Sequence, residues 1–186
     1  MPVVLLMRHG EKYESVLSDT GEIRASYLAT YFRNFRPDDV PFPTHLISMK
    51  PKKHSSWRCV ETLLPMSREC HMPLHILFHR EETRELVEYV KTLGPDAVPL
   101  ICWEHKAMVT IAREFGFPVL NWNDMPFANH KDSKAFNILW KLHKNEFESY
   151  HTFEIDPHGN ISHYCHPLVQ RFKIPKNSLT MFEIIS

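Results

Sequence analysis

Four short segments rich in apolar residues, each followed by a stretch with helix signals, constrain the fold of this chain more than any other feature. The segments cover residues 3–7, 45–48, 74–78 and 98–103. An apolar run of this length is typical of a strand that is buried on both faces of a sheet. Strand and helix alternate four times. This pattern predicts an α/β fold: a three-layer sandwich with a mostly parallel central sheet and helices on both faces.

The segments between and after these strands carry helix signals of different kinds. Apolar residues recur at helical spacing from residue 23 to residue 35, after a group of good N-capping residues. The segment 57–70 also has helical spacing but contains Pro65, where we expect a kink or a break. Two further helices, each followed by a glycine, are expected over residues 81–93 and 106–115.

The alternation stops after residue 117, and the C-terminal part carries other signals. The elements expected there are a polar loop (121–132), a short strand or helix (136–144), a hairpin with strands at 152–156 and 161–164, and a last strand (181–185). We therefore expect one domain over residues 1–186, with a motif-bearing core (1–116) and a C-terminal loop and hairpin (117–186).

The charge balance and the cysteines exclude several classes of protein. Lys plus Arg and Asp plus Glu are 22 each, so the chain has no global basic field for nucleic acid, and any anion site must be local. The four cysteines form no CxxC pair and indicate free thiols in a reducing compartment. The apolar run 3–7 is too short for a membrane span. We expect a cytoplasmic protein without a membrane partner; lysines near residue 50 leave a nuclear location open.

Reactive side chains follow three of the four predicted strands. Arg8 and His9 follow the first strand, Arg58 begins the helix after the second, and Glu104 and His105 follow the fourth. The carboxyl ends of parallel strands lie at one edge of a sheet, so the topology is expected to gather these residues. Guanidinium groups match phosphate oxygens, and a neutral imidazole can attack phosphorus. The group therefore suits a dianionic phosphoryl group.

Four motifs in this order resemble the histidine phosphatase superfamily, the phosphoglycerate mutase-like proteins. Residues 6–11 read Leu-Met-Arg-His-Gly-Glu and resemble its RHG signature. Residues 17–29 resemble the helix that follows that signature, residues 47–62 resemble its second-arginine motif, and residues 100–105 resemble its strand and second histidine. The ordered match over the chain up to Gly116 is far more specific than the RHG tripeptide alone.

The resemblance implies a phosphatase that acts through a phosphohistidine, in a small member of the family without a cap. His9 would take the phosphoryl group, while Arg8, Arg58 and His105 would bind its oxygens. The carbonyl of Gly10, or another nearby carbonyl, could hold the His9 ring in its nucleophilic tautomer. The family needs no cofactor and no metal for this chemistry. The expected substrate is a phosphorylated small molecule or a phosphoprotein.

The resemblance leaves the proton donor open. The mutase-like branch uses a glutamate just after the third strand, a place that Glu81 or Glu82 would occupy. Glu104 is a rival because it precedes His105, although side chains alternate along a strand and Glu104 could point away. Glu81 and Glu104 are therefore both candidate catalytic residues, each with a structural alternative at a helix start.

Two other functions and two other sites remain open at this point. The same rim would serve a phosphoglycerate mutase-like phosphotransferase, or a non-catalytic module that binds phosphate or a partner. His163, Cys165 and His166 are the densest group of metal ligands, but their alternation along a strand argues against a metal site. The aromatic side chains Trp122, Phe136 and Trp140 are expected to pack the C-terminal part against the sheet rather than to contact a ligand.

Overall fold

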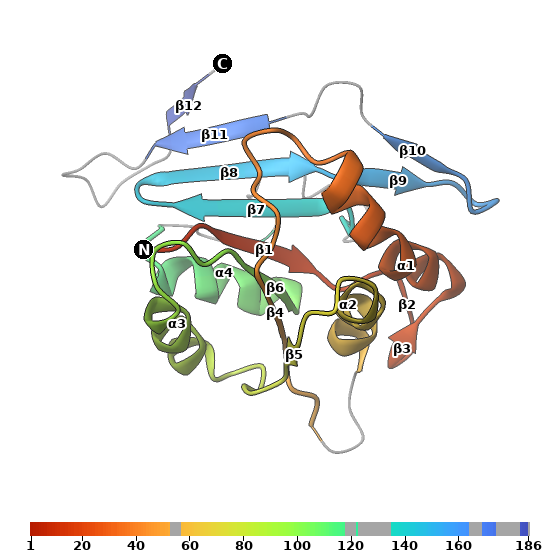
Figure 1. Ribbon diagram of the computed structural model, residues 1–186, viewed down its shortest axis with the longest axis horizontal. Coiled ribbons are helices and arrows are strands. Elements are labelled where there is room, and N and C mark those ends of the chain that lie inside the picture. Colours follow the sequence, from red (N-terminus) through yellow and green to blue (C-terminus); the bar gives the residue numbers. More distant parts are fainter. Residues whose placement is uncertain (53–56, 118–121, 123–134, 164–168, 174–182, 186) are drawn as a thin grey trace.

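The computed structural model describes residues 1–52, 57–117, 122, 135–163, 169–173 and 183–185 (Figure 1). In this part of the chain the helices are α1 (Asp19–Asn34), α2 (Arg58–Glu69), α3 (Thr83–Thr92) and α4 (His105–Glu114). The strands are β1 (Val4–Arg8), β2 (Lys12–Tyr13), β3 (Val16–Leu17), β4 (His45–Ser48), β5 (Leu74–His75), β6 (Pro99–Trp103), β7 (Ile138–His143), β8 (Glu146–His151), β9 (Phe153–Ile155), β10 (Ile161–His163), β11 (Val169–Lys173) and β12 (Glu183–Ile185).

One eight-stranded sheet forms the centre of the fold, in the order β12-β11-β8-β7-β1-β6-β4-β5. The neighbours β1, β6, β4 and β5 pair in parallel. From β1 outward, β7, β8, β11 and β12 pair antiparallel and extend the sheet on its other side. The expected α/β class with a parallel central sheet is confirmed, and the antiparallel extension is a feature that the sequence did not predict.

Helices cover both faces of the parallel strands, as expected (Figure 1). The chain passes from β1 to β4 to β5 in one direction across the sheet and then returns to β6. Because crossover connections are right-handed, this reversal places α1 and α2 on one face and α3 on the other. Figure 1 shows α4 beside α3, so the three-layer arrangement is complete.

The parallel strands lie in the core because their side chains are apolar on both faces. All five residues of β1 and all five of β6 are buried, in agreement with their continuous apolar sequence. The central pairs are Leu6 with Ile101 and Met7 with Cys102. Burial of each large apolar side chain contributes about 1.5–3 kcal/mol. The core therefore fixes where β1 and β6 end, and with them the residues that follow.

The helices agree with the sequence except at Pro65. The N-cap of α1 is Ser18, whose hydroxyl accepts a hydrogen bond from the N–H of Gly21 at 3.3 Å. Helix α2 runs through Pro65 without interruption, so the expected break is wrong. Leu63 and Met66, on either side of Pro65, are both buried. Their packing holds the helix together where the proline removes a backbone hydrogen bond.

Two strand predictions need correction, and the C-terminal hairpin is confirmed. The third strand is β5 alone, shorter than residues 74–78; its ladder with β4 covers two pairs, Leu46 with Leu74 and Ile47 with His75, and the two segments meet again at a bridge between Lys50 and His79. Residues 136–144 give a strand, β7, which pairs with the unpredicted strand β8. Strands β9 and β10 form the expected hairpin, and β12 lies within the expected last strand. The 121–132 loop falls outside the described residues except for Trp122.

Among the described residues, no helix is both long enough and apolar enough to span a lipid bilayer.

Candidate active site

The carboxyl ends of β1 and β6 lie side by side at one edge of the sheet. Their register pairs Arg8 with Trp103, so His9 and Glu104 are the next residues on neighbouring strands. The chain leaves β1 toward α1 on one face and leaves β6 into α4 on the other (Figure 1). Open α/β sheets bind ligands outside the carboxyl ends of their strands, at a point where the chain leaves two adjacent strands on opposite faces.

Four of the predicted residues influence one another electrostatically at this edge of the sheet. The positive charges of Arg58, Arg8 and His105 each lower the pKa of His9, and Arg58 also lowers the pKa of Arg8. Electrostatic influence of this kind falls off steeply with distance. Arg8, His9, Arg58 and His105, which come from three parts of the sequence, therefore lie within electrostatic reach of one another.

His9 is buried and held in a single tautomer. Its side chain is almost fully covered, with 2% exposed. The carbonyl of Gly10 lies 2.7 Å from Nδ1 of His9 and accepts its proton, which is the contact expected from the sequence. Burial, followed by the neighbouring positive charges, lowers the pKa of His9 to about 3 in spite of that hydrogen bond. The ring is neutral near pH 7, with the lone pair on Nε2.

Gly10 links the loop of His9 to helix α2. Its backbone N–H donates to the hydroxyl of Thr62 at 2.9 Å, and that hydroxyl donates to the carbonyl of Arg58 at 2.6 Å. A Cβ at Gly10 would meet the carbonyl oxygen of Gly21 at 3.0 Å, so the chain passes close to α1 as well. The guanidinium of Arg58 also donates from Nη1 to the carbonyl of Glu14 at 3.3 Å.

Glu11 and Arg24 brace the same loop from the other side. Arg24, 3% exposed, donates from Nε and Nη2 to the two carboxylate oxygens of Glu11 at 2.8 and 2.5 Å. Its remaining nitrogen, Nη1, donates to the carbonyl of Phe153 in β9 at 3.0 Å. A paired, forked contact of this kind fixes both side chains. Sequence analysis assigned no role to Arg24, because a buried arginine on an apolar helix face carries no local signal.

Arg8 is buried against an aromatic ring. Burial lowers the pKa of Arg8 to about 10, and the group still carries its charge at neutral pH. The ring of Phe136 lies over the guanidinium, with 4.1 Å from Cζ to the ring centroid. The same ring lies 5.8 Å from the ring of His9. Phe136, expected only to pack the C-terminal part, is thus a neighbour of two of the predicted site residues.

A second aromatic residue from the C-terminal part contacts His105. The rings of Trp122 and His105 meet edge to face at 5.4 Å, and Trp122 also packs on Trp140 at 5.4 Å. The expectation that Trp122 and Trp140 pack against the sheet is confirmed for this pair. The contact with His105 was not expected, because His105 and Trp122 are 17 positions apart and share no spacing signal.

Glu104 is the most heavily bonded carboxylate of the site. One oxygen, Oε1, lies 2.8 Å from Nδ1 of His105. The other, Oε2, accepts from Nε and Nη2 of Arg80 at 3.1 and 3.0 Å, and from the N–H of Ala107 at 3.2 Å as the N-cap of α4. Burial alone would raise the pKa of Glu104. The contact with His105 and the bonds from the Lys106 N–H and Arg80 nevertheless hold it well below its usual range.

Glu81 and Glu82, the other candidate acids, lie outside this group. The carboxylate of Glu81 is exposed and pairs with Lys52 at 3.0 Å, and this pairing lowers its pKa. Glu82 accepts from the N–H of His79 at 2.6 Å and closes the turn that leads into α3. Both glutamates therefore have local structural partners at the start of α3, which is the structural alternative stated for Glu81 in the sequence analysis.

The group considered as a metal site is described only in part. His163 lies in β10, where its Nε2 is 2.8 Å from the hydroxyl of Tyr27 and its ring stacks on Phe35 at 3.8 Å. Cys165 and His166 fall outside the described residues. Among the described residues, no cluster of three or more histidine, cysteine, aspartate or glutamate side chains is arranged to hold a metal ion.

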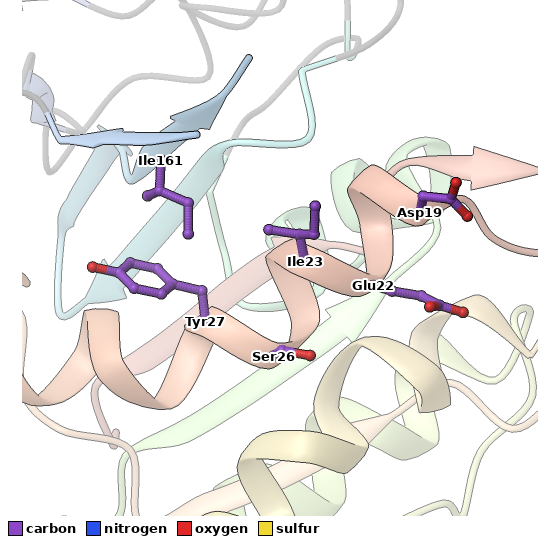
Figure 2. Close-up of a pocket in the computed structure, with 6 residues that line it drawn as sticks. All are labelled: Asp19, Glu22, Ile23, Ser26, Tyr27 and Ile161. Atoms are coloured by element: carbon purple, nitrogen blue, oxygen red, sulfur yellow. The ribbon is translucent and has the colours of Figure 1, made fainter. Parts of the chain in front are cut away.

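A cavity of about 500 Å³ lies between α1 and β10, away from the predicted site residues (Figure 2). Figure 2 shows Ile23, Tyr27 and Ile161 gathered at one end and the carboxylates of Asp19 and Glu22 at the other. Two negative charges at its rim repel a phosphate dianion. This cavity is therefore unsuited to a phosphate dianion, the ligand that the residues at the ends of β1 and β6 suit.

The comparisons with known proteins give distant structural likenesses alone. No family model matches the chain, and no curated protein matches it. A solved structure, that of the "putative phosphohistidine phosphatase SixA from Agrobacterium tumefaciens", is similar over 89% of this chain and 98% of its own, at 13% identity and a TM-score of 0.44. Likeness of this degree assigns neither a family nor an activity to the chain.

Proposed function

We propose that this chain is a phosphatase that hydrolyses phosphate monoesters through a phosphohistidine at His9. The observation that carries the proposal is the state of His9 itself: a buried, neutral ring whose Nδ1 is held by the Gly10 carbonyl, within the field of two arginines and a second histidine. Such a ring keeps a lone pair on Nε2 for attack on phosphorus, and its environment favours an incoming dianion. The resemblance of the four motifs to the histidine phosphatases supports the same assignment.

The first step forms one bond and breaks one. Nε2 of His9 attacks phosphorus, the ester oxygen departs with its bonding electrons and takes up a proton, and the phosphoryl group stays on the ring. In the second step, water attacks the same phosphorus, the phosphorus–nitrogen bond returns its electrons to Nε2, and one proton of the water is released. The products are an alcohol and inorganic phosphate, and His9 is regenerated.

Arg8 and Arg58 hold the phosphoryl oxygens in this proposal. Two guanidinium groups close to each other repel, and their mutual effect lowers the pKa of Arg8. A phosphate dianion between them relieves that repulsion and adds charge-assisted hydrogen bonds. The same charges stabilise the negative charge that spreads over the oxygens in the transition state. His105 completes the group from the start of α4.

A mutase-like transfer has less support in this chain. Return of the phosphoryl group to a second substrate oxygen requires a group that removes and returns protons efficiently. Glu81 is exposed and paired with Lys52, and Glu104 is engaged by Arg80, His105 and the first turn of α4. Both carboxylates are engaged by other groups. Hydrolysis depends less on such a proton-transfer group than a mutase reaction does.

Turnover of an aryl phosphate in the presence of a chelator tests the proposal. The wild-type chain, His9→Ala and the control His158→Ala are compared, since His158 is an exposed histidine in the turn between β9 and β10. The expected result is turnover by the wild type and by His158→Ala, and a loss of at least about 10³-fold in His9→Ala. Equal rates in His9→Ala and the wild type, or no turnover in any of the three, overturn the proposal.

A further inference from the structure

We infer that His105 is the proton donor to the leaving oxygen, and that Glu104 and Arg80 are positioning residues that hold its ring for this role. The inference rests on the function proposed above and deepens it. It replaces a carboxylic acid donor by an imidazole whose Nδ1 is bound to a carboxylate, so that Nε2 is the nitrogen left to serve the substrate.

The contacts of Glu104 show why this carboxylate is not the donor. Its partners are Nδ1 of His105, two nitrogens of Arg80 and the N–H of Ala107, and all of them donate. A carboxyl group surrounded by donors is an ionised acceptor and has no proton to give. What it supplies instead is an anchor at 2.8 Å for one nitrogen of the adjacent ring. A carboxylate at this distance favours the tautomer that carries a proton on Nδ1 and orients the ring.

Arg80 is held in place independently of Glu104. Its carbonyl accepts a hydrogen bond from Nε1 of Trp103 at 3.3 Å, and Trp103 is a fully buried residue of β6. The strand that ends at Glu104 therefore also fixes the backbone of the arginine that binds Glu104. Two guanidinium nitrogens on one carboxylate oxygen define the position of the carboxylate, and through it that of the His105 ring.

Glu81 lies at the edge of this group and pairs mainly with Lys52. It lies 3.9 Å from Nη1 of Arg80 and 3.0 Å from Nζ of Lys52. Glu81 and its partner Lys52 are exposed, whereas Glu104 and His105 are largely covered. The two glutamates that the sequence offered as acids are both acceptors in these contacts, and His105 is the group to which we assign the release of a proton.

The other groups that face the pair agree with this role. Arg8 and His9 follow the end of β1, where Glu104 acts electrostatically on Arg8 and His105 acts on His9, and the Trp122 ring meets His105 edge to face. The negative charge of Glu104 acts on Arg8 as well as on His105. In the first step His105 gives the proton on Nε2 to the departing oxygen. In the second step the neutral Nε2 takes a proton from the attacking water, which restores the starting state.

The test uses substrates whose leaving groups differ in their need for a proton. Rates of the full-length wild type, Glu104→Gln and Arg80→Gln are measured with nitrophenyl phosphate, phenyl phosphate and an alkyl phosphate across a range of pH. General acid catalysis raises the rate by about 10²–10⁴-fold, and its loss slows the reaction most for esters with poor leaving groups. We expect both variants to lose at least about tenfold more rate with the alkyl ester than with the nitrophenyl ester. We also expect the alkaline limb of their pH–rate profiles to move to lower pH.

Two further variants make the outcome decisive. Glu88→Gln changes an exposed carboxylate on α3, paired only with Lys91 in the contacts described, and is expected to match the wild type with all three esters. Glu81→Gln is expected to keep the wild-type dependence on the leaving group. If Glu81→Gln shows the selective loss, or if Glu104→Gln and Arg80→Gln slow all esters equally without a change in pH profile, the inference is overturned while His9 keeps its role. Unchanged turnover in His9→Ala removes both.

Discussion

The N–H of Gly10 and the hydroxyl of Thr62 meet at 2.9 Å although they are 52 residues apart in the chain. The hydroxyl is itself oriented by the carbonyl of Arg58, to which it donates at 2.6 Å. This pair of hydrogen bonds sets the loop of His9 against the first turn of α2. The distance between the nucleophile and the arginine of α2 therefore depends on one buried threonine.

Substitution of Thr62 by valine is expected to destabilise the fold and slow turnover. Valine has the same shape but leaves the buried N–H of Gly10 without its acceptor, which costs about 1–3 kcal/mol. Thr62→Ser keeps the hydroxyl and serves as the control. The free energy of unfolding in urea and the rate with an aryl phosphate are measured for both. Equal stability of Thr62→Val and Thr62→Ser would show that the hydrogen bond has no such importance.

The low pKa of His9 predicts a specific dependence of stability on pH. Burial lowers this pKa from 6.5 in the unfolded chain to about 3 in the folded one. Between these values the unfolded chain binds a proton that the folded chain excludes. The free energy of unfolding is therefore highest above pH 6.5 and falls as the pH drops toward 3, by at most about 1.4 kcal/mol per pH unit from this group.

The variant His9→Asn isolates that contribution, because all other titrating groups are shared. Between pH 7 and pH 5 the wild type is expected to lose about 2 kcal/mol more stability than His9→Asn, as measured by urea unfolding. Parallel losses in the two proteins would mean that His9 titrates normally in the fold. The neutral, buried nucleophile would then be excluded.

Gly21 is expected to tolerate no side chain, since the loop after His9 lies directly against it. A Cβ at this position would lie 2.1 Å from the carbonyl oxygen of Glu11. Gly21→Ala must displace that backbone, at a cost of about 1–3 kcal/mol, and lower the rate through the movement of the loop. Ser26→Ala, at an exposed position of the same helix, is the control. Thermal unfolding that is equal in the two variants would contradict the close contact.

Phe136 is expected to shield the nucleophile from reagents. Its ring lies over Arg8 and beside His9, and it is 7% exposed. Phe136→Ala is expected to lose about 3 kcal/mol of stability and to increase the rate at which diethyl pyrocarbonate modifies His9. Mass spectrometry of the peptide with His9 follows the reaction, with Phe136→Leu as the variant that keeps most of the bulk. A rate unchanged in Phe136→Ala would show that the ring gives His9 no cover.

The sequence predicted the parallel part of the fold because burial and periodicity agree there. β1 and β6 are apolar at every position, and the reactive residues follow them without a gap. Strand β8 was missed because its two glutamates look like surface residues. Glu148 is in fact buried, where it pairs with Lys141 of β7 and accepts from the hydroxyl of Tyr150 at 2.8 Å. Because this charge is neutralised by a partner on the neighbouring strand, hydropathy along the sequence does not reveal β8.

Site residues that belong to one sequence motif could be predicted. Residues whose role depends on a contact between distant segments could not. His9 and its tautomer partner Gly10 are neighbours in the sequence. Arg80 gave no signal, because its partner Glu104 is 24 residues away and the pairing depends on how α3 and α4 pack. Phe136 was likewise assigned to packing, since nothing near it in the sequence connects it with Arg8.

The most direct test of the account is to trap the phosphorylated histidine. The protein is mixed with an aryl phosphate that is labelled in its phosphoryl group, quenched in alkali, where phosphohistidine is stable, and digested with trypsin. The account predicts label on the peptide that begins at His9, formed at least as fast as the enzyme turns over and absent from His9→Ala. Label on a different peptide, or turnover by the wild type with no labelled protein at any time before the steady state, would contradict it.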